Sequence, residues 1–197
     1  MKSWVVETEI MSGHCYEVPP LKRVSIRATA RKIRSIACEL AGQPFDPPYF
    51  DVFRFLDVVL PRHWEEFTVE VIEPSVMSAR YGTAHAITIP ADQTILVHED
   101  IWSRAEAGEG RDRMTLAHEL GHLVLHARAS FARKVESRPV ATYRQSEWQA
   151  DAFAGELLMA AHHLGGCRGP EDLMVCFGVT FSAAQTQWKA FQRDGLV

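Results

Sequence analysis

The stretch Leu116-Ala117-His118-Glu119-Leu120-Gly121-His122-Leu123 carries most of the information in this chain of 197 residues. It contains His-Glu-x-x-His. Four residues of α-helix advance the chain by about 6 Å and turn it about 40° past a full turn, so His118 and His122 can bind one ion. The rest of the stretch is apolar on almost every side. We therefore expect a buried helix whose narrow polar sector faces a cavity or a ligand.

Two histidines do not complete a zinc site, which needs a third protein ligand and, if it is catalytic, an open fourth position. His126 lies one turn further along the same face. It is about 9 Å along the axis from the midpoint of the histidine pair, too far for a bond of about 2 Å. We expect His126 to support a ligand histidine, to line the cavity or to pack in the core.

A second helix begins near Glu147 and offers better candidates. Its apolar residues recur at spacings of three and four: Ala150, Phe153, Ala154, Leu157, Leu158 and Ala161. Glu147 and Asp151 extend this stripe and would direct two carboxylates inward. A buried carboxylate is tolerated when it binds a metal or a ligand histidine, so Glu147 is predicted to bind zinc and Asp151 to orient an imidazole N–H. The alternative is that both are helix-start acids favoured by the helix dipole; Glu136 and Glu156 are the fallback ligands.

These residues also carry a family resemblance. The segment HELGHLVLH from His118, followed by EWQADAFAGELLM from Glu147, closely resembles the ImmA/IrrE family of metallo-endopeptidases, a compact gluzincin, across about 79–159. The resemblance implies that His118, His122 and Glu147 bind zinc, that Glu119 is the general base, and that Asp151 is the hydrogen-bonded partner of a ligand histidine. Ala160 replaces the proline that often follows LLM, and Asp151 stands where Asn is frequent.

The predicted fold class is α+β, a mini-zincin-like domain in which a small antiparallel or mixed sheet packs on the active-site helix with further helices. We expect residues 1–23 to form an N-terminal strand or arm and 24–197 a single metallopeptidase domain, with a zinc core at 79–160 and C-terminal packing helices at 171–197. The other expected elements are helices over 26–40 and 49–60, a strand over 67–72, and a hairpin of 85–90 and 94–98. In zincin-like enzymes, the edge of such a sheet pairs with an extended substrate.

Charge and cysteine content exclude several other classes of protein. The net charge of −4 gives no bulk attraction to nucleic acid or to acidic membranes. The four cysteines form no Cys-x-x-Cys pair, which favours reduced thiols in the cytoplasm. No apolar run is long enough to cross a membrane, and the first residues do not resemble a signal peptide.

Three features allow competing interpretations. The basic face of the helix over 26–40 (Arg27, Arg31, Lys32 and Arg34) is interpreted as solvated rather than as a nucleic-acid patch, because no aromatic platform accompanies it. Residues 171–191 resemble a helix-turn-helix, but Lys189 is the one basic residue of its second helix, so packing is preferred to DNA binding. A second zinc site at His162, His163 and Cys167 is the weakest of these alternatives.

The functional prediction is a zinc-dependent endopeptidase in which Glu119 takes a proton from the attacking water. Tyr143 is the candidate for polarising the scissile carbonyl. The resemblance implies a specific protein substrate, a helix-turn-helix repressor encoded nearby in a phage, mobile-element or stress-response circuit. The alternative is a non-catalytic, zinc-stabilised regulatory or toxin–antitoxin interaction protein. Glu119 argues against it, because a structural site needs no base and is usually closed by a fourth ligand.

Overall fold

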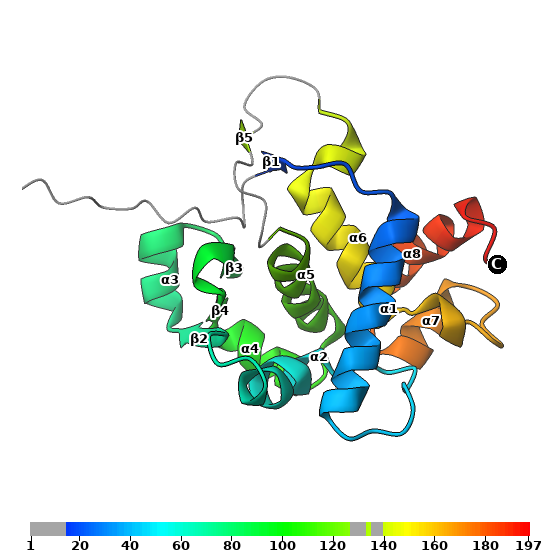
Figure 1. Cartoon of the computed structure of the whole chain (residues 1–197), viewed down its shortest axis with the longest axis horizontal. Coiled ribbons are helices and arrows are strands. Elements are labelled where there is room, and N and C mark those ends of the chain that lie inside the picture. The colour runs from blue at the N-terminus through cyan, green and yellow to red at the C-terminus, as the bar shows by residue number, and fades with distance from the viewer. Residues whose placement is uncertain (1–14, 127–132, 135–139) are drawn as a thin grey trace, which may run out of the picture.

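A computed structural model describes residues 15–126, 133–134 and 140–197. The chain has the predicted α+β class. Helix α5 (Gly110–His126) runs through the middle of the molecule, with a small sheet on one side and helices α6 (Ser146–Leu158) and α1 (Arg23–Leu40) on the other (Figure 1). Both helices that carry the candidate ligands thus lie in the interior.

The sheet is mixed and has three strands in the order β2-β4-β3. Strand β2 (Thr68–Ile72) runs parallel to β4 (Thr94–His98), and β3 (Ala86–Ile89) pairs with β4 as an antiparallel hairpin. The predicted strand and hairpin are therefore confirmed. A separate two-stranded ladder joins β1 (Tyr16–Glu17) to β5 (Arg133–Lys134).

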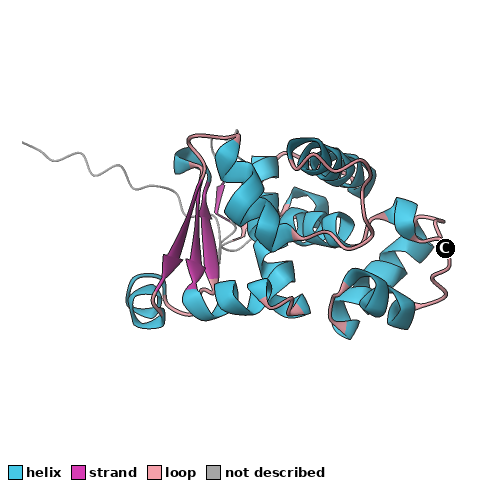
Figure 2. Ribbon diagram, turned by 90° about the horizontal axis from the view of Figure 1, so that it is seen from below, coloured by secondary structure: helices cyan, strands magenta, loops and turns pink. Residues whose placement is uncertain are grey.

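Both faces of the sheet are covered, because alternate side chains of β3 and β4 enter different cores. Ile87 and Leu96 pack with Met77 of α3 (Pro74–Tyr81). Ile95 and Val97 point the other way, into the main core that contains α5. Figure 2 shows α3 on one side of the sheet and the remaining helices on the other. Helix α3 and helix α4 (Glu99–Glu106) are additions to the elements expected from the sequence.

The remaining helices agree with the sequence pattern. Residues 49–60 form a short α2 (Val52–Arg54), a π-helical turn (Phe55–Val59) and a 3-10 turn that begins at Leu60. At the C-terminal end, α7 (Pro170–Phe177) and α8 (Phe181–Arg193) form the predicted pair. No described helix combines the length and apolarity needed to cross a membrane.

Helices α5 and α6 approach closely at Gly121. A Cβ atom at this position would lie 3.1 Å from the Cα of Ala150 and 3.1 Å from a ring carbon of Phe153. Glycine therefore permits the spacing that brings the polar sector of α5 opposite the first turns of α6.

The prediction of a solvated basic face on α1 is wrong at Arg34. Arg31 and Lys32 are exposed, but Arg34 is fully buried. Its guanidinium donates hydrogen bonds to Asp46 and to the carbonyl oxygen of Leu157. The sequence pattern could not show this, because the acceptors come from the loop after α1 and from the end of α6.

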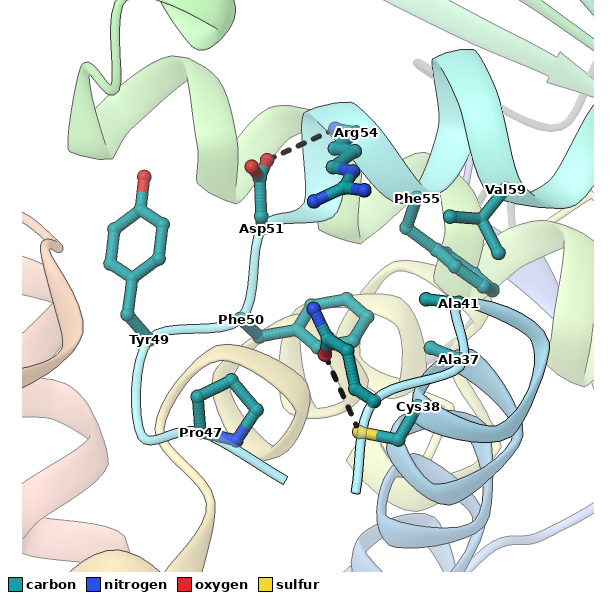
Figure 3. Close-up of a pocket in the computed structure, with 11 residues that line it drawn as sticks. Ala37, Cys38, Ala41, Pro47, Tyr49, Phe50, Asp51, Arg54, Phe55 and Val59 are labelled. Atoms are coloured by element: carbon teal, nitrogen blue, oxygen red, sulfur yellow. Dashed lines mark hydrogen bonds between the residues drawn. The ribbon is translucent and has the colours of Figure 1, made fainter. Parts of the chain in front are cut away.

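The loop between α1 and α2 encloses a pocket of about 150 Å³. Cys38 of α1 and Pro47 and Phe50 of the loop line it (Figure 3).

Residues 1–14 of the segment expected to form an N-terminal strand or arm lie outside the described residues. The division into an arm and one metallopeptidase domain stays a prediction.

Candidate metal centre

Helix α5 carries three of the predicted site residues on its polar sector. His122 is fully buried and Glu119 is almost so, whereas His118 is partly exposed. The apolar residues around them fill the main core, as the sequence predicts: Leu116, Leu120 and Leu123. The core thus fixes α5 with these polar side chains turned toward α6 and the sheet.

Glu147, in the first turn of α6, faces both histidines. The Nε2 atoms of His118 and His122 lie 2.9 Å apart, and each lies 3.3 Å from a carboxylate oxygen of Glu147. These three ligand atoms form one of the groups in the described chain that are compact enough to hold a metal ion. The structure therefore brings together the three residues predicted to bind zinc.

Asp151 lies one turn beyond Glu147 and contacts the other side of His118. Its Oδ1 atom is 2.8 Å from His118 Nδ1. A carboxylate at this position accepts the Nδ1–H of the imidazole, so the neutral ring presents an Nε2 lone pair to the site.

A chain of polar groups orients His122 in the same way. The amide nitrogen of Gln149 donates to the carbonyl oxygens of Pro19 and Tyr143, so its Oε1 must accept from His126 Nε2, 3.1 Å away. Burial lowers the pKa of His126 to about 4, so its ring is neutral and its Nδ1 is an acceptor. His122 Nδ1, 3.2 Å from this acceptor, then carries the proton, and His122 Nε2 also presents a lone pair.

This donor set fits a divalent cation. Two imidazole lone pairs 2.9 Å apart repel each other unless a positive group lies between them. In the metal-free chain a proton fills that role: burial would lower the pKa of His118, but the hydrogen bonds with Asp151 and Glu147 raise it to about 10. Burial would likewise raise the pKa of Glu147, but its contacts with the two histidines lower it to about 2. Two imidazoles and an ionised carboxylate are the donors that zinc prefers.

Glu119 is held by a residue that sequence reasoning missed. The hydroxyl of Thr88, a buried residue of β3, lies 2.7 Å from Glu119 Oε2 and 2.9 Å from its backbone oxygen. Thr88 is the one polar side chain in the short strand β3, and nothing in the sequence pairs it with Glu119, thirty-one positions later. Gln149 was missed for a similar reason, since its partners belong to three other segments.

The other candidates lie elsewhere or are not described. Glu156 is buried and paired with Arg23 and Arg27, away from the histidines. Glu136 lies outside the described residues. Tyr143 is half exposed in a 3-10 turn (Thr142–Arg144), and its proposed role stays a prediction.

A pocket of about 370 Å³ opens beside Asp151. Its wall includes the apolar side chains of Met114, Trp148 and Met159 and the cationic side chain of Arg111. The candidate metal centre is thus bordered by a space of the size that takes a few amino-acid side chains.

Comparison with known proteins agrees with this geometry. A model of the M78 peptidase family, described as the IrrE N-terminal-like domain, matches residues 65–189. No curated protein and no solved structure matches the chain. The family match covers β2 through most of α8, and therefore the sheet, both site helices and Thr88. The chain belongs to the M78 family of IrrE N-terminal-like peptidases and is a metallopeptidase.

Proposed function

We propose that the chain is a zinc-dependent endopeptidase that cleaves a specific protein partner. The observation that supports this most strongly is the convergence of His118, His122 and Glu147, with Glu119 held beside them by Thr88. Two imidazoles with one carboxylate are a zinc donor set that leaves a fourth position open.

A bound zinc ion would supply Lewis-acid activation of the scissile carbonyl and of a water molecule. The remaining chemistry belongs to the protein. Glu119 acts as a general base when it takes the proton of the attacking water, and as a general acid when it returns this proton to the leaving amine. Thr88 fixes the carboxylate of Glu119 by a short hydrogen bond, so the base does not need to be oriented at the moment of reaction.

The proposed substrate is a helix-turn-helix repressor encoded near this chain, in a phage, mobile-element or stress-response circuit. The family resemblance supports this partner. We further propose that the substrate binds in an extended form along the sheet. The reason is that β3 is the last strand in the sheet order, lies next to α5 and carries Thr88.

The test compares the full chain with its Glu119→Gln variant, both loaded with zinc. Each is co-expressed with the neighbouring regulator, and mass spectrometry of the regulator detects a cut. We expect the wild type to cleave and the variant to lose activity by a factor of about 10² to 10⁴, since the amide cannot accept the proton.

Equal zinc content in both proteins is the control, because a difference in cleavage then reflects the loss of the Glu119 carboxylate and not a loss of zinc. Equal cleavage by the two proteins would contradict the role of Glu119. Stable binding of the regulator without a cut by either protein would overturn the endopeptidase proposal in favour of a non-catalytic interaction protein.

A further inference from the structure

A second group of potential metal ligands lies at the far end of α6. Asp46 belongs to the loop between α1 and α2, and His162 and His163 belong to a 3-10 turn (Ala161–His163) that follows α6. Asp46 Oδ2 lies 2.8 Å from His162 Nε2 and 3.4 Å from His163 Nε2. One ligand atom from each residue lies within 4.8 Å of the other two, as at the centre on α5.

His163 provides an independent sign that this group can bind a ligand. Its Nε2 atom is buried and has no hydrogen-bond partner among the described residues. A buried polar nitrogen without a partner destabilises the folded chain. Because this nitrogen faces the carboxylate of Asp46 at 3.4 Å, a cation between them would satisfy both groups.

Arg34 holds the carboxylate of Asp46 in position. The guanidinium contacts both oxygens, at 2.7 Å for Oδ1 and 2.8 Å for Oδ2, and also binds the carbonyl oxygen of Leu157. Each carboxylate oxygen has a second lone pair, so Oδ2 can accept from Arg34 and still bind an ion. The positive charge of Arg34 keeps Asp46 ionised, but it also repels a cation. Affinity should therefore be lower here than at the site on α5.

We propose that Asp46, His162 and His163 form a second site for a divalent transition metal such as Zn²⁺, which joins the loop after α1 to the end of α6. Two imidazole nitrogens and one carboxylate oxygen suit this class of ion. In the metal-free chain His162 Nε2 donates a hydrogen bond to Asp46. When the ion binds, that proton moves to Nδ1 and the ion takes its place. Cys167, which the sequence suggested as a ligand, is not part of the group.

The site is structural in our proposal and does not depend on the endopeptidase function. Arg34 already contacts the same end of α6, because its guanidinium donates a hydrogen bond to the carbonyl oxygen of Leu157. An ion bound by Asp46 and the two histidines would hold the loop after α1 against this end, and the folded state would gain stability from it.

The test is isothermal titration of the full, chelator-treated chain with Zn²⁺, repeated with Co²⁺. We expect two equivalents to bind to the wild type and one to the His162→Gln/His163→Gln variant. Glutamine at 162 can still donate a hydrogen bond to Asp46, so the variant keeps that contact while it loses both imidazoles. His63→Gln, at an exposed histidine outside both groups, is the matched control and should bind two equivalents.

Thermal unfolding gives a second measurement, which shows to which site each equivalent of Zn²⁺ binds. The second equivalent of Zn²⁺ should raise the Tm of the wild type and of His63→Gln, and it should leave the double variant unchanged. The single variant His162→Gln, at the more exposed of the two histidines, serves if the double variant does not fold. The same number of equivalents in the wild type and in a folded histidine variant would overturn the proposal, whatever the centre on α5 binds.

Discussion

At the residue scale, the centre depends on which nitrogen of each histidine carries the proton. Asp151 determines this for His118, and the Gln149–His126 pair determines it for His122. Both imidazoles are thereby oriented with their Nε2 atoms toward one point before any ion arrives. Preorganisation of this kind raises affinity because the ligands need little rearrangement.

Gln149→Met tests this arrangement. Methionine has a similar length but neither accepts from His126 Nε2 nor donates to the carbonyl oxygens of Pro19 and Tyr143. We expect zinc affinity to fall by a factor of about 10 to 100, as for other hydrogen-bonding partners of ligand histidines. Competition with a chromophoric chelator measures the affinity.

Gln185→Met is the control, since Gln185 lies exposed on α8. It should bind zinc as the wild type does. If a folded Gln149→Met protein binds zinc with unchanged affinity, the proposed orientation of His122 through His126 is wrong.

At the element scale, the spacing of α5 and α6 sets the ligand geometry. His118 and His122 come from one helix and Glu147 from the other, so a shift between the helices changes the distances among the donors. Gly121 lies at the contact, between the two histidines.

Gly121→Ala should therefore weaken both the fold and the metal centre. The added methyl group would meet backbone atoms of Ala150 at 3.1 to 3.2 Å, and the backbone of α6 yields less easily than a side chain. Overpacking of this kind costs about 1 to 3 kcal/mol, partly offset by the better helix propensity of alanine, about 1 kcal/mol. We expect a net loss of stability in urea unfolding together with weaker zinc binding.

Arg111→Ala is the control for a substitution on the exposed start of α5. Its unfolding free energy should stay within about 0.5 kcal/mol of the wild type. Unchanged stability and zinc affinity in Gly121→Ala would show that α6 adjusts freely, and that close helix contact is not what positions Glu147.

At the scale of the whole molecule, buried arginines join segments that lie far apart in the sequence. Arg113 of α5 is buried; its guanidinium donates to the carbonyl oxygens of Phe50 and Phe177 and lies over the ring of Tyr49, 3.9 Å from its centroid. Burial lowers its pKa, although the group stays charged at neutral pH. One side chain thus connects the site helix to α7 and to the loop before α2.

Arg113→Met should destabilise the chain by about 2 to 4 kcal/mol, because the carbonyl groups of Phe50 and Phe177 lose their donor inside the protein. Chemical denaturation measures the change, with exposed Arg111→Met as the matched control. A variant as stable as the wild type would mean that apolar packing replaces these hydrogen bonds without loss, as happens in some proteins with buried ion pairs.

The pattern of amino acids predicts the local elements and the kinds of ligand. The spacing of His118, Glu119 and His122 and the apolar pattern around them predict the buried helix, and the alternation over 85–98 predicts the hairpin, because these patterns repeat within one element. The position of Glu147 and Asp151 on the inward stripe of a second helix follows from the same periodicity.

Which distant groups meet depends on how the elements pack in the folded chain. Thr88 at Glu119, Gln149 behind His126, and Arg34 with Asp46 beside His162 all join residues from different elements. Periodicity records which face of an element is buried, but it does not record which polar partner that face meets. A buried polar group needs a partner wherever the fold supplies one, so these pairings depend on how the elements pack and not on the local sequence.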